Sequence, residues 1–98
     1  MDINELRKYK KQIIQITKKN KALNIRVFGS VSTGDAQADS DVDFLIDIGD
    51  GQNLLDFIRL QQELADLLLC DVDLAPSSTL REEIKSNILE TAIPIEEL

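Results

Sequence analysis

Two short runs in this 98-residue chain alternate aspartate with apolar residues, and they hold the side chains best suited to chemistry. Asp41 and Asp43 lie two positions apart in the first run, and Asp71 and Asp73 in the second. Because successive side chains of a β-strand point to opposite faces, each aspartate pair shares one face of its strand. Adjacent strands lie about 5 Å apart, so the carboxylates of both pairs can converge if the two strands are neighbours.

Carboxylates gathered in one patch repel each other unless a cation lies among them. The chain contains no histidine, which excludes imidazole bases, Ser-His and Cys-His nucleophile pairs and most zinc sites. Its single Cys70 lies in an apolar stretch and is interpreted as a core residue. Oxygen ligands without nitrogen or sulfur suit Mg²⁺ or Mn²⁺, so we predict a site for such an ion.

Gly29 and Ser30 end the apolar run IRVF and precede the first aspartate pair. A glycine at the end of a strand lets backbone N–H groups approach a phosphate closely, and Ser30 can donate a hydroxyl hydrogen bond to the same group. Phosphate donors beside metal-binding carboxylates indicate a nucleoside triphosphate site. The chemistry that follows is two-metal phosphoryl-group transfer, in which the attacking oxygen and the leaving pyrophosphate are each stabilised by a cation.

Each of these features also has a simpler interpretation. A Gly-Ser pair alone is an ordinary strand-to-turn junction, and two aspartates alone can be a solvated strand edge or the metal motif of a sugar-nucleotide transferase. Asp39, Asp41 and Asp43 also have the spacing of the first ligands in an EF-hand loop. We reject this interpretation because Phe44 stands where glycine is required and Asp50 replaces the bidentate glutamate. Asp71 shares the face of Asp73, and the mid-strand position favours Asp73 as the functional residue. Asp47 lies further along the first strand and is expected to be solvated.

The hydrophobic periodicity predicts one compact α/β domain, residues 1–98, that positions these groups. Apolar residues at helical spacing predict three helices, over residues 3–19, 53–69 and 78 to about 91. Short apolar or alternating runs predict three strands, at residues 25–28, 41–48 and 71–75. Ser78 is the expected N-cap of the third helix, and Pro76 ends the third strand.

Eighteen acidic and eleven basic residues give the chain a formal charge of -7 and a pI near 4.4. A field of this sign repels phosphate backbones, so DNA and RNA are disfavoured partners. A chain of this size has no room for a separate substrate-binding domain, so we expect the acceptor to arrive on a basic macromolecule. The N-terminal sequence lacks the apolar segment of a signal peptide and no run is long enough to cross a membrane, which predicts a cytoplasmic protein.

Gly29-Ser30, ten intervening residues and then Asp41-Val42-Asp43 form a pattern that resembles the G-S-x₁₀-D-x-D signature of the nucleotidyltransferase β superfamily. The segment VDLAPSSTLREEIKSNILETAIPI resembles the part of these proteins that follows the third catalytic strand. The likeness runs from Asn24 to Ile95. The short chain is similar specifically to the minimal nucleotidyltransferase group, whose members are often antitoxins paired with HEPN-domain ribonuclease toxins.

The resemblance implies an α/β (α+β) fold with a small, mixed, three- to four-stranded sheet flanked by helices. It implies that Asp41 and Asp43 bind two Mg²⁺ ions, for which Mn²⁺ can substitute, and that Asp73 is the third metal-binding carboxylate and a candidate general base. Gly29 and Ser30 would hold the triphosphate of ATP. The resemblance further implies transfer of AMP from ATP to a tyrosine hydroxyl of a HEPN-type toxin, bound in a hetero-oligomer, which silences the toxin.

One departure from this family's pattern follows the Gly-Ser pair. Members commonly continue with Ala-Arg-Gly, whereas this chain has Ser32, Thr33 and Gly34, so an arginine near the phosphates is missing. Either Arg26 or a lysine takes its place, or catalysis is weak. The alternative function is therefore a non-catalytic antitoxin that neutralises its toxin by direct binding. An aminoglycoside-type transferase is a weaker third hypothesis, because no second domain is present to hold a sugar substrate.

Overall fold

The computed structural model describes residues 1–33 and 41–98, with Ser30 and Thr33 described as backbone only. Its helices are α1 (Ile3–Arg7), α2 (Lys10–Lys19), α3 (Ser30–Thr33), α4 (Leu54–Leu68) and α5 (Glu82–Thr91), with the short 3₁₀ helices η1 (Ser77–Thr79) and η2 (Ile95–Glu97). Its strands are β1 (Ala22–Phe28), β2 (Val42–Ile48), β3 (Val72–Pro76) and β4 (Ile93–Pro94). None of the helices in these two ranges is long and apolar enough to cross a membrane.

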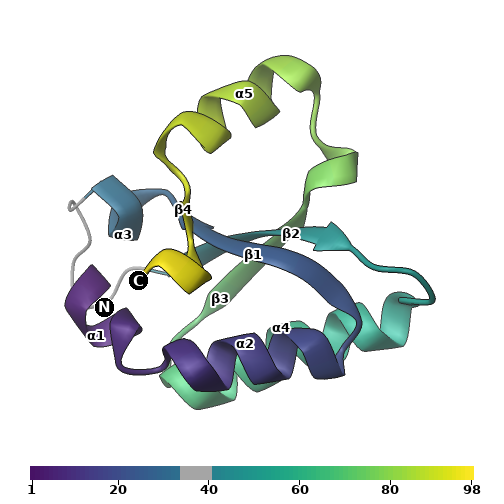
Figure 1. The fold of residues 1–98 in the computed structure, drawn as a ribbon, viewed down its shortest axis with the longest axis horizontal. Coiled ribbons are helices and arrows are strands. Elements are labelled where there is room, and N and C mark those ends of the chain that lie inside the picture. The colour runs from purple at the N-terminus through teal and green to yellow at the C-terminus, as the bar shows by residue number, and fades with distance from the viewer. Residues whose placement is uncertain (34–40) are drawn as a thin grey trace.

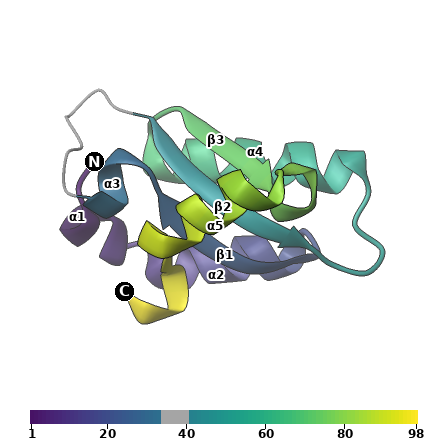
Figure 2. The same ribbon diagram turned by 90° about the horizontal axis from the view of Figure 1, so that it is seen from above.

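The strands form a mixed four-stranded sheet in the order β3-β2-β1-β4. β2 runs parallel to β3, while β1 is antiparallel to both β2 and β4. Helices α2 and α4 cover one face of this sheet, and α5 stands over the opposite face (Figure 1, Figure 2). The predicted fold class, a small mixed sheet flanked by helices, is confirmed. The two-residue strand β4 is an addition that the sequence did not indicate.

The hydrophobic core lies between the sheet and the layer formed by α2 and α4. Val42, Phe44 and Ile46 alternate along β2, are fully buried, and belong to one cluster with Leu60 and Leu64 of α4. Because alternate residues of β2 are committed to this core, the residues between them project from the opposite face of the sheet, toward α5. That opposite face is the one on which the predicted aspartates lie.

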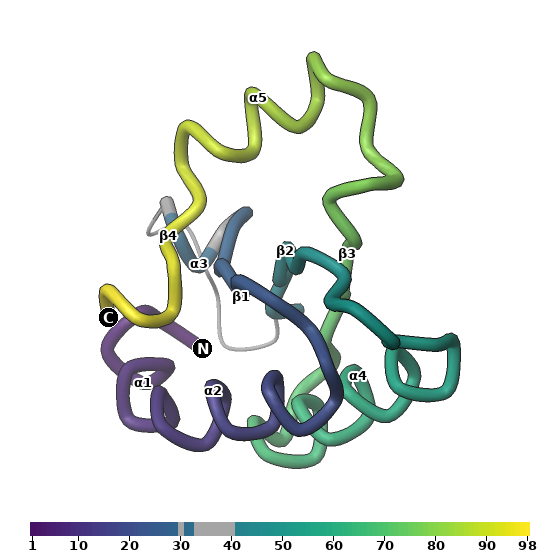
Figure 3. The backbone as a smooth tube through the Cα atoms, turned by 45° about the vertical axis from the view of Figure 1, so that its right-hand side comes forward, coloured from purple at the N-terminus to yellow at the C-terminus, as the bar shows by residue number. Residues whose placement is uncertain are grey.

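α5 is attached to the rest of the molecule mainly by its two ends. Figure 3 shows the chain rising from β3, passing through α5 and returning to the sheet at β4. None of the residues of α5 is buried. The helix therefore adds little to the core, even though it shares a side of the sheet with the predicted aspartates.

The predicted N-terminal helix is interrupted at Lys8 and Tyr9, which separate α1 from α2. The N–H groups of Lys8 and Tyr9 each bond to the carbonyl three positions earlier, a tighter step than that of an α-helix. Leu6 and Ile13 are fully buried on either side of this break. The prediction of one continuous helix was wrong because these two residues lie at a spacing that a single helix would also accept.

The predicted C-terminal helix begins later than expected, at Glu82 with Arg81 as its N-cap, so the assignment of Ser78 as N-cap was wrong. The preceding residues form η1 instead. The hydroxyl of Ser77 donates a hydrogen bond to the Asp47 carboxylate in β2, which holds this segment against the sheet. That contact joins residues 30 positions apart, and a local sequence pattern does not reveal it.

Candidate active site

Asp43 and Asp73 lie side by side on the face of the sheet turned toward α5. The register of β2 and β3 pairs Asp43 with Asp73 and Val42 with Val72. Both valines are buried in the core, so the aspartates project from the other face. Asp43 is half-buried, Asp73 is exposed, and their side chains are close enough to share a hydrogen bond. The structure thus brings one aspartate from each run together.

The Asp43 carboxyl occupies an unfavourable position for a negative charge. Burial is the largest cause, followed by the charge of Asp73, a hydrogen bond with Asp73 and the charge of Asp41, and together they raise the pKa of Asp43 from 3.8 to about 6. All of these effects favour the protonated form. A divalent cation between the two carboxylates would reverse the balance, because its charge outweighs their repulsion.

Asp41 is exposed and precedes β2, which begins at Val42. Within residues 1–33 and 41–98, no three acidic, histidine or cysteine side chains are gathered closely enough to hold a metal ion. The predicted set of three carboxylates is therefore assembled only in part, with Asp43 and Asp73 together and Asp41 outside the pair. The donor chemistry fits a hard cation, since Asp43 and Asp73 offer carboxylate oxygens alone. Metal binding by the three aspartates stays a prediction.

Gly29 lies directly against the Asp43 carboxylate. It follows Phe28, the β1 residue paired with Asp43, and it has φ +74°, a conformation that residues with a side chain rarely adopt. A Cβ atom at Gly29 would lie 2.5 Å from Oδ2 of Asp43. Glycine therefore lets the chain turn here without displacing the carboxylate. Ser30 begins α3 immediately afterwards, so the backbone of the predicted Gly29-Ser30 pair lies next to Asp43.

Asp47 lies further along the same face of β2, and the expectation that it is solvated was wrong. Its carboxylate accepts hydrogen bonds from the Ser77 hydroxyl and, at 2.9 Å, from the side-chain amide of Asn24. The guanidinium of Arg26 pairs with it at 3.7 Å. Burial alone would raise the pKa of Asp47, but these three partners and the charge of Lys85 outweigh burial and lower the pKa.

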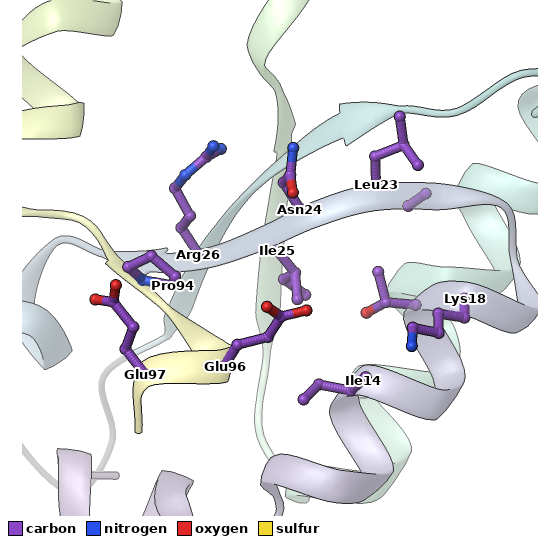
Figure 4. Close-up of a pocket in the computed structure, with 11 residues that line it drawn as sticks. Ile14, Lys18, Leu23, Asn24, Ile25, Arg26, Pro94, Glu96 and Glu97 are labelled. Atoms are coloured by element: carbon purple, nitrogen blue, oxygen red, sulfur yellow. The ribbon is translucent and has the colours of Figure 1, made fainter.

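A bulge in β1 places Asn24 and Arg26 beside Asp47. The pairing of β1 with β2 shifts between Leu23 and Ile25, and Asn24 has φ +38°. Figure 4 shows the side chains of Asn24 and Arg26 on one side of β1 and Ile25 on the other side, toward α2. Asparagine tolerates positive φ better than most residues, so an asparagine inside a strand-like run is the signal that could have indicated the bulge.

The residues that replace the family's Ala-Arg-Gly run are described only in part. The Ser32 hydroxyl donates a hydrogen bond to the carbonyl of Gly29 at 2.9 Å and so supports the turn beside Asp43. Gly34 and the side chain of Thr33 lie outside the described part of the chain. The charge of Arg26 is partly balanced by Asp47, and its substitution for the missing arginine stays a prediction.

A groove of about 520 Å³ lies between α4 and β3 and is bordered by Asp41, Asp71 and Asp73. We call it the α4–β3 groove. Another hollow, of about 450 Å³, lies between α2, β1 and η2, where Ile14 and Glu96 face it and none of these aspartates lines it (Figure 4). Of the carboxylate pair at the candidate site, Asp73 therefore borders the α4–β3 groove, whereas Asp43 does not line it.

A family model described as polymerase beta, nucleotidyltransferase matches residues 11–97. The chain belongs to this nucleotidyltransferase family. The match covers both the Gly29-Ser30 pair and all the aspartates discussed above. It confirms the resemblance that the spacing of these residues indicated, and with it the prediction that the chain is an enzyme of the nucleotidyl-transfer class.

This nucleotidyltransferase is similar to the protein adenylyltransferase MntA of Thermococcus cleftensis, with 42% identity over 69 residues, which are 70% of each chain. It matches the solved structure of a protein provisionally named a minimal nucleotidyltransferase with a TM-score of 0.87 and 36% identity, over 96% of each chain. A toxin-antitoxin structure with AMP-PNP matches it with a TM-score of 0.74 and 26% identity, over 88% of this chain and 71% of that chain. The nucleotidyltransferase fold is thereby confirmed.

Proposed function

We propose that this nucleotidyltransferase transfers AMP from ATP to a tyrosine hydroxyl of a HEPN-type toxin and so acts as its antitoxin. The observation that carries the proposal is the Asp43 and Asp73 carboxylate pair beside the backbone turn at Gly29. Its oxygens suit a metal ion, and the amides of a glycine turn suit a phosphate. The name of the Thermococcus cleftensis relative supports a protein as acceptor. AMP-PNP in a related toxin-antitoxin structure supports ATP as donor and a toxin as partner.

The chain's own groups would divide the work of holding ATP. Backbone N–H groups at Gly29 and Ser30, with the Ser30 hydroxyl, would bind the triphosphate oxygens. Asp43 and Asp73, joined by Asp41, would hold Mg²⁺ or Mn²⁺. When bound, the ion supplies positive charge that neutralises the triphosphate and makes the α-phosphorus easier to attack.

Asp73 is the carboxylate best placed to accept the acceptor's proton. It is exposed, whereas Asp43 is half-buried, so a hydroxyl carried by a macromolecule can reach it. The acceptor oxygen forms a bond to the α-phosphorus while its proton passes to an Oδ atom of Asp73. The bond between the α-phosphorus and the bridging oxygen breaks, and pyrophosphate leaves. The products are an AMP-modified protein and pyrophosphate.

The proposal is tested by the intact mass of a HEPN-domain protein encoded beside this one, after incubation with the purified chain, ATP and Mg²⁺. We expect a gain of one or more AMP units with the wild type and no gain with Asp43→Asn. Asp66→Asn is the matched control, because Asp66 is an exposed aspartate of α4 that does not border the α4–β3 groove. It should modify the partner as the wild type does.

Other outcomes would contradict the proposal in distinct ways. Label on tRNA or on a small metabolite, with the mass of the partner unchanged, would exclude a protein acceptor. A tight complex without modification would instead favour the antitoxin that acts by binding alone.

A further inference from the structure

The α4–β3 groove extends the candidate active site along the edge of the sheet. Asp73 borders it, together with Asp71 and Asp41, so three carboxylates face one groove of about 520 Å³. Among the described residues that line it, none is a lysine or an arginine. The groove therefore favours a positively charged occupant, which the formal charge of -7 on the whole chain also attracts.

β3, on one side of the groove, is an edge strand whose sheet neighbour is β2. The carbonyl of Asp71 accepts a hydrogen bond from the N–H of Val42 at 3.0 Å and so faces β2. By the alternation of a parallel ladder, the backbone groups of Val72 and Leu74 face outward. Gln61 of α4 donates to the outward carbonyl of Val72 at 2.8 Å. No strand within residues 1–33 and 41–98 pairs with this outer edge, which is thus a template for an added strand.

α4, on the other side of the groove, offers contacts that suit a polypeptide. Ile58 is 49% exposed and, with Ala65, provides an apolar surface for small side chains. The exposed amide of Gln62 can both donate to and accept from a peptide backbone. A mixture of amide and apolar contacts beside a strand edge that no described strand covers is typical of sites that bind extended peptides.

We propose that the α4–β3 groove binds the acceptor segment of the partner protein as an extended, basic strand that pairs with the outer edge of β3 and carries its hydroxyl to Asp73. This inference rests on the proposed function for the identity of the segment. The groove itself supplies the register, since backbone hydrogen bonds to the N–H of Val72 and to Leu74 fix which residue of the segment lies beside Asp73.

The pairing also specifies a sequence pattern for the acceptor. Side chains of an added strand alternate between the face of Asp71 and Asp73 and the face of Val72. Lysine or arginine two positions from the acceptor tyrosine therefore lies near the carboxylates. The residues between them face α4 and are small or apolar.

Amide hydrogen exchange tests the groove without any catalytic step. The probe is a blocked peptide, Lys-Val-Lys-Val-Tyr-Val-Lys, with a control in which every lysine is replaced by glutamate. At saturating lysine peptide, exchange at the N–H groups of Val72 and Leu74 should slow by about tenfold or more. The glutamate peptide should bind at least about tenfold more weakly. Unchanged exchange at both amides would overturn the inference.

Steady-state kinetics with the partner protein provides the second test. Asp71→Lys should raise KM for the partner about tenfold and leave kcat within about twofold, because it repels a basic segment without touching the reacting atoms. Asp66→Lys makes the same change of charge outside the groove and should leave KM unchanged. Equal KM values for the two variants would overturn the inference.

The two tests separate the failure of the groove from the failure of the proposed function. If the lysine peptide protects Val72 and Leu74 but the wild type modifies no protein, the proposed function fails and the groove stands. If the wild type modifies its partner while both amides stay unprotected, the groove inference fails and the function stands.

Discussion

Asp43 and Asp47 lie on the same face of β2, four positions apart, and their surroundings shift their pKa values in opposite directions. The neighbours of Asp43 are the carboxylates of Asp73 and Asp41, and its pKa is raised to about 6. The neighbours of Asp47 are a hydroxyl, an amide and a guanidinium, and its pKa is lowered. The described partners of Asp47 offset its negative charge, whereas the described charged neighbours of Asp43 add to it.

This difference separates a structural carboxylate from a candidate ligand-binding one. A half-buried carboxylate is costly unless donors or cations offset the loss of water. The donors around Asp47 come from β1 and η1, so its charge is satisfied within the fold. Around Asp43, the described charged neighbours are other carboxylates, an environment that a bound cation would stabilise. The four predictions that follow test each side of the comparison, starting with the largest expected effect.

Removing the charge of Asp43 should abolish the chemistry without harming the fold. For Asp43→Asn we expect nucleotidyl transfer to fall roughly 10³-fold or more, since an amide is a poor ligand for a hard cation. The free energy of unfolding should stay unchanged or rise by up to about 1 kcal/mol, because a partly exposed repulsion is relieved. Transfer assays and chemical denaturation measure the two effects. Near-normal transfer would remove Asp43 from the candidate site.

Adding a methyl group at Gly29 should displace the Asp43 carboxylate by steric contact, without changing any charge. In Gly29→Ala the new Cβ meets Asp43 and the residue is held at positive φ, so we expect a loss of roughly 2 kcal/mol of stability or more and at least about tenfold in transfer. Gly51→Ala is the matched control. Gly51 has φ +79° but no atom within 4 Å of the new Cβ, so it should cost about 1 kcal/mol and no activity. Equal effects of the two variants on transfer would contradict the role given to the contact with Asp43.

Truncating Asp47 should lower stability and leave transfer nearly unchanged, the reverse of what we expect for Asp43→Asn. Asp47→Ala leaves the buried hydroxyl of Ser77 and the amide of Asn24 without their acceptor, so we expect a loss of about 1–2 kcal/mol in the free energy of unfolding. Transfer measured well below the melting temperature should stay within about twofold. Asp66→Ala removes an exposed aspartate and should cost much less. A loss of transfer without a loss of stability would indicate that Asp47 takes part in catalysis and is not a structural residue.

The smallest expected effect is on the pH dependence of stability. As the pH rises, ionisation of Asp43 should lower the free energy of unfolding, whereas ionisation of Asp47 should raise it. Native Asp43 keeps its proton up to about pH 6, whereas the unfolded chain releases it near 3.8, so ionisation of Asp43 lowers stability as the pH rises through this window. The lowered pKa of Asp47 stabilises the protein above about pH 3.8, and this contribution is lost as the pH falls through the native value.

Denaturation in EDTA from about pH 4 to pH 8 can separate these contributions. The stability of Asp43→Asn relative to wild type should grow by up to about 1 kcal/mol across the window from 3.8 to about 6 and then level off. A difference that is constant with pH would show that the proton on Asp43 does not matter to folding.

The sequence was sufficient to predict those features of the candidate site that depend only on residue spacing within one strand. The period of two in each aspartate run places its carboxylates on one face, and no further contact is needed to infer it. The pairing of Asp43 with Asp73 depends in addition on the two strands being parallel neighbours in this register, which the sequence left open. The position of Asp41 was not predictable in the same way, because it depends on β2 beginning one residue later, at Val42.

The surroundings of Asp47 could not be predicted, because they depend on three separate segments. Ser77 lies 30 residues away along the chain, and Asn24 lies 23 residues away and reaches Asp47 through a bulge. The predictions of one continuous N-terminal helix and of a C-terminal helix that begins at Ser78 were wrong for a related reason. Periodicity reports which residues face the core, and it is insensitive to where hydrogen bonds shift from one step to another.

The lack of fully buried residues in α5 affects how readily this helix unfolds locally. Only Lys85 and Ile88 of this helix are even half-buried, so its local unfolding free energy should lie below that of the core. Limited proteolysis should therefore cleave within residues 82–91 well before it cleaves β1 or β2. The helix over the site face is then a loosely held cover, and a protein partner could displace or reorder it at small cost while the sheet beneath keeps its aspartates in register.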